Sequence, residues 1–177
     1  MPILIRRYRP DDAERLLEAA RESVEQIFPW MPWARSGYSL EDSRAWIAHC
    51  EATWAQGVEY NFAIVDQDDR YLGGCGLNQL NRGHRVANLG YWVRTSARAR
   101  GIATAAVPAL ADFAFRETDL ARLEIVVAVG NAASHRVAEK SGAIREGLAH
   151  DRLHLHGRQH DAVVYALLRP RPHPHSG

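Results

Sequence analysis

Several features that would assign a protein to a familiar class are scarce or missing in this 177-residue sequence. The charges almost cancel, with 22 Lys and Arg against 21 Asp and Glu, so net charge does not favour binding to nucleic acid or an anionic membrane. No apolar run approaches the roughly 20 residues that span a bilayer, and no signal peptide opens the chain. We therefore expect a cytoplasmic, single-domain protein that binds neither nucleic acid nor membrane.

Cysteine is also scarce, which excludes a disulfide framework. Cys50 and Cys75 are the only two, and their apolar surroundings predict reduced core thiols or at most one disulfide. His154 and His156 would share one face of a strand, with His150 nearby. Because no cysteine or carboxylate stands at a recognisable ligand spacing, we predict no metal site.

Two common phosphate-binding motifs, GxxxxGK[ST] and GxGxxG, are missing, which argues against the nucleotide-binding folds that use them. Residues 88–115 still have the form of an anion site, since an alternating strand leads through a polar loop into a helix at Gly101. First-turn N–H groups of a helix lack internal partners and carry the positive end of its dipole. With Arg98 and Arg100 beside them, we predict a phosphorylated ligand.

Hydrophobic periodicity predicts the element order β-α-α-β-β-β-α-β-α-β-β. Strand patterns cover residues 3–8, 60–66, 71–80, 88–94, 122–129, 143–151 and 154–168, the last broken around 156–158. Helical patterns begin near residues 12, 39, 102 and 132. The three glycines within residues 73–76 predict a bulge or a close backbone approach. This order indicates an α/β (α+β) fold, one mixed sheet with helices on both faces, and a disordered tail at 169–177.

Two motifs carry a resemblance to a known family. Residues 98–103, RARGIA, fit the pattern [Q/R]xxGx[G/A] and resemble the acetyl-CoA pyrophosphate loop of the GNAT superfamily of N-acetyltransferases. Residues 131–147 contain NxxSxxVxEKxG followed by EG, and residues 30–33 read WMPW. Both are similar to the RimJ/RimL branch, which acetylates protein N-termini. The resemblance implies a GNAT domain over residues 1–168, with a mostly antiparallel seven-stranded sheet, about four helices, and splayed fourth and fifth strands.

The resemblance also implies where acetyl-CoA, the cosubstrate, would bind. In this family the open edge of the fourth strand pairs with pantetheine, and a backbone N–H there polarises the thioester carbonyl. The amine then attacks the acetyl carbon directly in a ternary complex. The expected acetyl-CoA contacts are Tyr91, Trp92, Val93, Arg98, Arg100, Gly101, Ile102, Ala103, Thr104, Asn131 and Ser134.

The catalytic candidates are Ser134 and Tyr91. Many family members protonate the departing thiolate with a tyrosine on the helix after Asn131, but Ala138 stands at that place. Ser134 is the only hydroxyl in that helix before Ser141, and helix capping is its alternative role. For a base, Glu41, His150, Asp151 and His154 all remain open. An α-amine is already about 10–20% neutral at pH 7, whereas a lysine is below about 0.1%. The lack of a strong base therefore favours a low-pKa amine.

The acceptor is expected at Trp30 and Trp33, which two prolines hold on a constrained loop. These rings either form an aromatic wall of the acceptor pocket or fold back onto the core. The predicted function is acetylation of a protein N-terminal α-amine. The alternatives are acetylation of a small-molecule amine, such as a polyamine, an amino acid or an antibiotic, and a non-catalytic acyl-CoA-binding module. An unpaired sheet edge is compatible with a homodimer.

Overall fold

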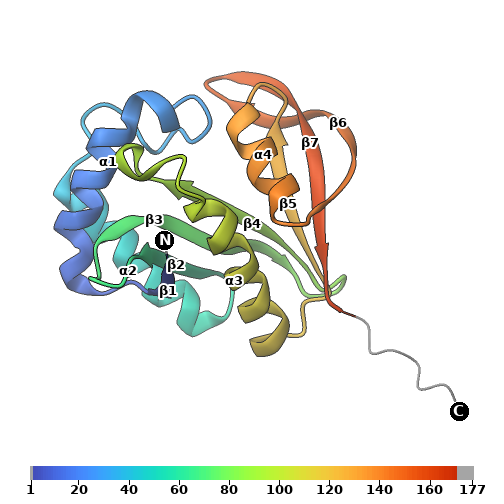
Figure 1. Ribbon diagram of the computed structural model, residues 1–177, viewed down its shortest axis with the longest axis horizontal. Coiled ribbons are helices and arrows are strands. Elements are labelled where there is room, and N and C mark those ends of the chain that lie inside the picture. Colours follow the sequence, from blue (N-terminus) through green and yellow to red (C-terminus); the bar gives the residue numbers. More distant parts are fainter. Residues whose placement is uncertain (1, 171–177) are drawn as a thin grey trace, which may run out of the picture.

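The computed structural model describes residues 2–170, and a seven-stranded sheet runs through it in the order β1-β2-β3-β4-β5-β7-β6 (Figure 1). Neighbouring strands are antiparallel except β4 and β5, which are parallel. This confirms the predicted mixed, mostly antiparallel sheet. The strands are β1 Leu4–Arg7, β2 Tyr60–Val65, β3 Tyr71–Asn81, β4 Val86–Val93, β5 Arg122–Ala128, β6 Ile144–Leu155 and β7 Arg158–Leu168.

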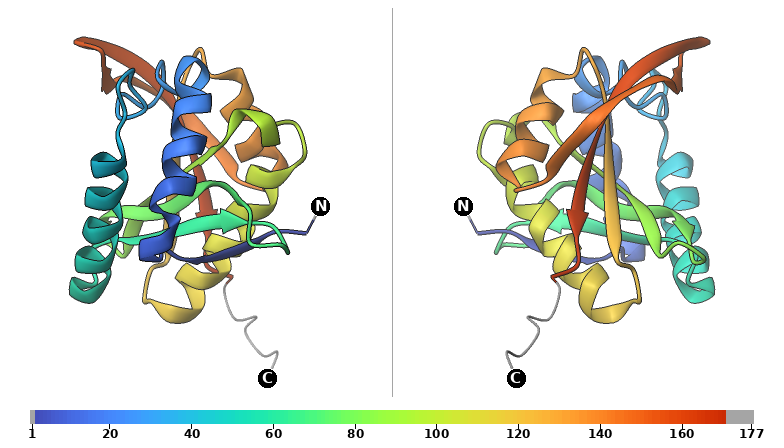
Figure 2. Two further views of the ribbon diagram at one scale, coloured as in Figure 1. Left: turned by 90° about the vertical axis from the view of Figure 1, so that its left-hand side faces the viewer. Right: turned by 90° about the vertical axis from the view of Figure 1, so that its right-hand side faces the viewer.

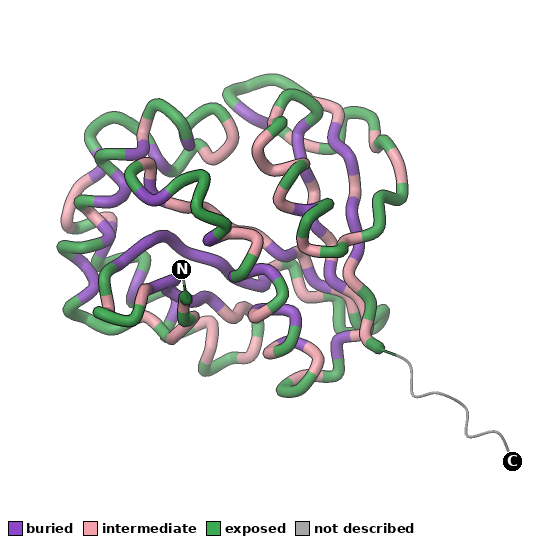
Figure 3. The backbone as a smooth tube through the Cα atoms, in the orientation of Figure 1, coloured by how far each residue is buried: buried purple, intermediate pink, exposed green. Residues whose placement is uncertain are grey.

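Within the described residues, four α-helices cover the two faces of the sheet, as predicted (Figures 1 and 2). They are α1 Ala13–Ile27, α2 Leu40–Gln56, α3 Ile102–Glu117 and α4 Ala132–Lys140. On one face, Leu16 of α1 packs with Val65 and Tyr71. On the other, Leu110 of α3 belongs to the larger cluster that includes Phe62. The buried backbone in Figure 3 therefore follows the central strands and the inner sides of the helices.

Local sequence signals explain where two of these helices begin. Ser39 caps α2, because its hydroxyl accepts from Asp42 N–H at 3.2 Å while the Asp42 carboxylate accepts from Ser39 N–H at 2.8 Å. Gly101 precedes α3 with φ 74°, in the left-handed region that glycine adopts at little cost. The chain can therefore turn sharply from the loop into α3.

The splay that the resemblance implies is present between β4 and β5. The two strands pair only at their starts, from Val86 with Arg122 to Asn88 with Glu124. Beyond Asn88, β5 continues alongside β7, whereas residues 89–93 of β4 keep only β3 as a neighbour. Five residues of β4 thus expose one backbone edge toward the opening between β4 and β5, which diverge in Figure 1.

Three further expectations concern the two cysteines, membrane-spanning helices and the C-terminal tail. Both cysteines are free and buried, and burial raises the pKa of the Cys50 thiol to about 12. Within residues 2–170, no helix combines the length and apolarity needed to cross a bilayer. Arg169, the first residue of the expected tail, donates to the Leu120 and Thr118 carbonyls at 2.9 and 2.6 Å. Residues 171–177 lie outside the described residues, and so does that part of the tail prediction.

Candidate functional site

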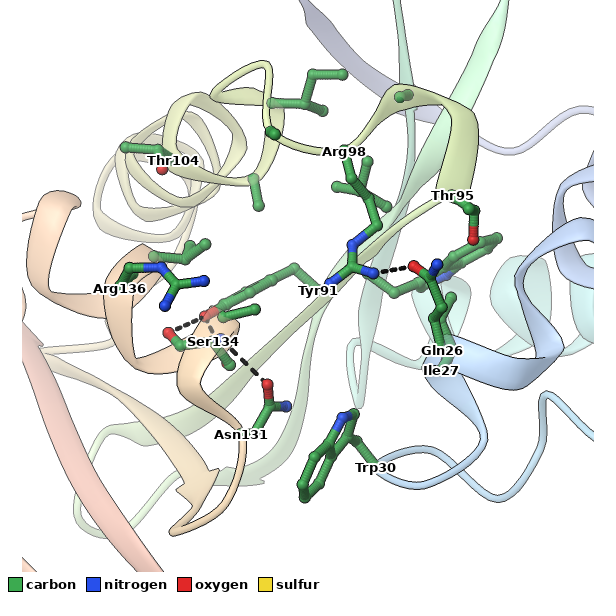
Figure 4. Close-up of a pocket in the computed structure, with 18 of the residues that line it drawn as sticks. Gln26, Ile27, Trp30, Tyr91, Thr95, Arg98, Thr104, Asn131, Ser134 and Arg136 are labelled. Carbon is green, nitrogen blue, oxygen red and sulfur yellow. Dashed lines mark hydrogen bonds between the residues drawn. The ribbon is translucent and has the colours of Figure 1, made fainter.

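A groove of about 610 Å³ lies between α3, α4, the open end of β4 and the loop after α1 (Figure 4). The structure brings together here most of the residues expected to contact acetyl-CoA. These are Tyr91, Trp92, Val93, Arg98, Gly101, Ile102, Ala103, Thr104, Asn131 and Ser134. Arg100 is the exception, since its exposed side chain does not line the groove.

The start of α3 presents a row of backbone donors to this groove. The first hydrogen bond of the helix runs from Ala105 N–H to Gly101 C=O at 2.9 Å. The N–H groups of residues 99–104 have no acceptor within the described part of the chain. Together with the helix dipole, these donors suit an anion with several oxygen atoms, such as a diphosphate.

Cationic side chains stand on both rims of the groove. Arg98 reaches into it from the α3 side and donates to the Gln26 side chain (Figure 4). Arg136 and Lys140 line it from α4. Sequence reasoning missed these two, although they stand four residues apart on a helix capped by Asn131, a spacing that places them on one face.

Tyr91 and Ser134 join the two sides of the splay. The Tyr91 hydroxyl lies 2.9 Å from Ser134 Oγ and donates to the Ser134 carbonyl at 3.1 Å (Figure 4). Ser134 N–H in turn donates to Asn131 Oδ1 at 3.2 Å, so the residue also serves the helix cap. Burial raises the pKa of Tyr91 to about 12, which keeps its hydroxyl protonated at every working pH.

The loop between β4 and α3 is anchored to α1. Arg94 is buried and donates to Glu22 at 3.1 Å and to Glu18 at 2.5 Å. Glu22 also accepts from Ser96 N–H at 2.7 Å. These hydrogen bonds, above all those from Arg94, lower the pKa of Glu22 to about 2. The ion pair between Arg94 and Glu22 therefore fixes the loop that leads to the N-terminal end of α3.

A second cavity of about 520 Å³ lies on the opposite face of the sheet, beneath α2 and the loop before it. Its walls are rich in aromatic rings, including Tyr8, Trp33, Tyr38, Trp46 and Trp92. The two cavities share three lining residues: Met31, Tyr91 and Trp92. They therefore meet at the open part of β4, one from each face.

Two titratable groups of the second cavity, Asp42 and His49, have protein partners. Asp42 is bound by Ser39 and Arg35, and the hydrogen bonds from Ser39 lower its pKa. His49 lies 2.8 Å from Glu59 through Nε2 and stacks on Trp46. Sequence reasoning missed His49, an exposed residue of α2 that lies three positions after Trp46 and so on the same side of the helix. The four base candidates named from the sequence, Glu41, His150, Asp151 and His154, line neither cavity.

The structure separates the two tryptophans expected at the acceptor. Trp33 lines the second cavity and packs edge-on against Trp92, with ring centroids 5.1 Å apart. Trp30 lines the groove instead, and its ring lies over Gly130, where an added Cβ would be 3.3 Å from Cη2. Trp33 is 37% exposed and Trp30 is partly buried, so neither is a fully buried core residue.

Comparison with known proteins gives consistent matches. The acetyltransferase (GNAT) domain family matches residues 3–144. YdaF of Bacillus subtilis (strain 168), provisionally named a ribosomal N-acetyltransferase, is 35% identical over 94% of this chain and 91% of its own. The ribosomal-protein-serine acetyltransferase of Escherichia coli (strain K12) is 28% identical over 77% and 75%. The structure of Mycobacterium smegmatis RimJ with CoA-disulfide superposes with a TM-score of 0.82 at 26% identity, covering 94% of this chain and 81% of that one.

Proposed function

Because the chain belongs to the GNAT acetyltransferase family and is an acetyl-CoA-dependent N-acetyltransferase, we propose that its acceptor is the α-amine of a protein N-terminus. The observation that carries this is the meeting of two cavities at Tyr91 and Trp92, in the open part of β4. One cavity is polar and cationic at its rim, and the other is aromatic. A donor held in the first and an amine held in the second would meet at the unpaired edge of one strand.

The groove fits acetyl-CoA through its own donor set. The unpaired N–H groups of residues 99–104 suit the pyrophosphate, and Arg98, Arg136 and Lys140 add charge for the phosphate groups. The open edge at residues 89–93 offers N–H and C=O groups to the pantetheine amides, as an added strand would. Bound there, acetyl-CoA supplies an activated acetyl group.

The Tyr91–Ser134 pair is the best placed of the described groups to stabilise the departing thiolate. A phenol with a pKa of about 12 is a far weaker acid than a thiol, whose pKa is roughly 8.5. It therefore does not give up its proton outright, and the pair acts by hydrogen bonding to the sulfur. With the Tyr91 proton donated to the Ser134 carbonyl, Ser134 is the donor in the 2.9 Å contact between the two hydroxyls, and rotation of the Ser134 hydroxyl would redirect its proton to the thiolate.

The lining of the second cavity favours an acceptor amine that is already partly deprotonated at pH 7. Asp42 accepts hydrogen bonds from Ser39 that lower the pKa of its carboxylate, which makes it a weak base. An α-amine is about 10–20% neutral at pH 7, so it can react without a base that removes its proton, whereas a lysine side chain is almost entirely protonated and needs such a base. The names of the Bacillus and Escherichia coli relatives, which refer to ribosomal substrates, point to the same acceptor class.

CoA release measured against a panel of amines tests this proposal. The panel contains short peptides with a free N-terminal serine or alanine, the same peptides N-terminally blocked but carrying lysine, and the polyamine spermidine. We expect the free N-terminal peptides to have the highest kcat/KM. Preferential turnover of spermidine or of the blocked lysine peptides would assign the protein to small-molecule or side-chain acetylation instead.

A further inference from the structure

The floor of the second cavity is made of glycine. Asn61, Gly76 and Gly90 stand in register across β2, β3 and β4, so their side-chain positions face the same side of the sheet. A Cβ added at Gly76 would lie 2.1 Å from Asn61 Oδ1, and one at Gly74 would lie 2.6 Å from the Tyr8 hydroxyl. At these two positions, neighbouring side chains already occupy the space above the strand.

Gly90 is different, because nothing in the fold requires a glycine there. An added Cβ would meet no atom within 4 Å, and the backbone is not in the left-handed region. Glycine inside a strand costs stability relative to residues with side chains. The space above Gly90 is therefore kept open at some cost, and it lies one residue before Tyr91, where the two cavities meet.

Asn61 directs an unused acceptor toward this space. Asn61 is buried, with 6% of its surface exposed, and its Nδ2 donates to Glu59 Oε2 at 3.0 Å. Glu59 Oε2 also accepts from His49 at 2.8 Å. Because a carboxylate can only accept, it holds the amide nitrogen on its side and turns Oδ1 over Gly76. No donor from residues 2–170 reaches that oxygen.

We propose that Asn61 Oδ1 and the open space above Gly90 form the binding position of the reacting amine, called the amine seat below. An amine N–H donates to Asn61 Oδ1, and the first carbon of the acceptor lies over Gly90. Since strands are about 4.8 Å apart, an oxygen above β3 leaves room for a single amine nitrogen before β4. This inference rests on the proposed function, because it positions the amine that acetyl transfer needs.

The chemistry of the amine seat favours a neutral amine. A carboxylate in this position would stabilise an ammonium ion and raise its pKa, which would remove the nucleophilic lone pair. A neutral amide oxygen accepts one N–H without that penalty. With that N–H fixed on Asn61, the lone pair is left free on the side of β4, where the open edge lies. Asn61 is thus a positioning residue, and Gly90 determines how bulky the acceptor can be.

Gly90→Val and Asn61→Ala test the amine seat, with Gly147→Val as the matched control. Gly147 also lies in a strand, its added Cβ meets nothing within 4 Å, and it lines neither cavity. The probe is whichever panel amine the wild type acetylates fastest. We expect Gly90→Val to lower kcat/KM for it at least about 100-fold and Asn61→Ala to raise its KM about 10-fold, as for one lost hydrogen bond. The Kd for desulfo-CoA and the Tm of Gly90→Val should match the wild type.

These measurements distinguish a failure of the proposed function from a failure of the inference about Asn61 and Gly90. A wild type that acetylates no amine in the panel overturns the proposed function and this inference together. An active wild type whose Gly90→Val variant keeps its kcat/KM overturns the inference alone. Loss of desulfo-CoA affinity in Gly90→Val would also overturn it, because the open space would then belong to the groove.

Discussion

At the scale of single residues, the hydroxyls of Tyr91 and Ser134 are the groove hydroxyls that meet each other across the splay between β4 and β5. The place where a helix tyrosine is expected is filled by Ala138, which is fully buried in the core. Tyr91 instead brings a phenol to the same helix from β4. The two hydroxyls touch each other, so their contributions to catalysis should not be independent.

Tyr91→Phe and Ser134→Ala should each lower kcat about 10- to 100-fold, the value of a hydrogen bond to a charged group of roughly 1.5–3 kcal/mol. The double variant should cost little more than either single change, because the hydroxyls act as a unit. Steady-state kinetics at saturating acetyl-CoA give kcat. Calorimetry with desulfo-CoA gives the cofactor affinity, which should be the same in the variants as in the wild type. Additive losses would show that the hydroxyls act separately.

The pH dependence follows from the raised pKa of Tyr91, which is about 12. Because the hydroxyl keeps its proton up to that value, kcat should show no basic limb from Tyr91 between pH 7 and pH 10. A kcat–pH profile of the wild type beside Tyr91→Phe checks this. A fall in kcat near pH 9 that disappears in Tyr91→Phe would contradict the assignment.

Candidate residues could be named from the sequence where a local pattern marks them. Ser134 was named because it is the only hydroxyl in its helix before Ser141, and Tyr91 was named from its place on the fourth strand, but the contact between them was not predicted. The two residues are 43 positions apart, and Asn61 and Gly90 meet only through strand register. No spacing in the sequence signals such contacts, because they depend on how the sheet is paired.

At the scale of elements, α1 holds the loop that leads into α3. Glu22 accepts from buried Arg94 and from Ser96 N–H, and its pKa falls from 4.5 to about 2. A carboxylate with a depressed folded-state pKa adds stability above its unfolded pKa, and this is lost as pH falls through the folded value. The stabilisation should therefore be complete above about pH 4.5 and disappear toward pH 2.

Glu22→Gln should accordingly destabilise the protein at pH 7 but make little difference near pH 2. Urea unfolding of both proteins across this range measures the gap in free energy of unfolding. The variant should also bind desulfo-CoA more weakly at pH 7, since the loop before α3 loses its anchor. A gap that stays constant from pH 7 to pH 2 would contradict the role of the ionised carboxylate.

The rims of the groove give a second prediction at this scale. Arg98→Ala and Arg136→Ala should each weaken desulfo-CoA binding by roughly 1.5–3 kcal/mol, because each removes a charged donor. Arg100→Ala is the matched control, since Arg100 is in the same loop but does not line the groove. Calorimetry that finds Arg100→Ala as costly as Arg98→Ala would show that the loop rearranges on binding.

The elements themselves were largely predictable. Periodicity predicted the order of the seven strands and four helices found in residues 2–170, because amphipathic patterns record which face is buried. The division between the last two strands was misplaced, since residues 154 and 155 belong to β6 and the turn lies at 156–157. Ser39 and Asn131 marked helix starts through their capping chemistry. The separation of Trp30 from Trp33 was not predictable, since two prolines make the loop irregular and no period describes it.

At the scale of the whole molecule, two cavities on opposite faces of one sheet both reach the open part of β4. Trp33→Ala should raise KM for the amine and leave KM for acetyl-CoA nearly unchanged, because Trp33 lines only the second cavity. Trp30→Ala should do the reverse, since Trp30 lines only the groove. Thermal unfolding beside the kinetics serves as control, and a large fall in Tm with equal damage to both substrates would assign the rings to the core.

Assembly remains a prediction at this scale. β1 and β6 end the sheet, so each has one side without a strand partner among residues 2–170. Exposed Ile144 and Leu148 lie on β6. A homodimer through one of these edges would leave the open part of β4 untouched, because that edge lies in the interior of the sheet order.

The central claim is that the two cavities form one active site, and a bisubstrate ligand tests it most directly. In such a conjugate, the sulfur of CoA is joined through an acetyl bridge to the α-amine of a serine peptide. We predict by calorimetry that it binds about 100- to 10,000-fold more tightly than desulfo-CoA, because one tether brings both halves to their sites. Gly90→Val should abolish that gain and Gly147→Val should keep it. A conjugate that binds no more tightly than desulfo-CoA would contradict the account.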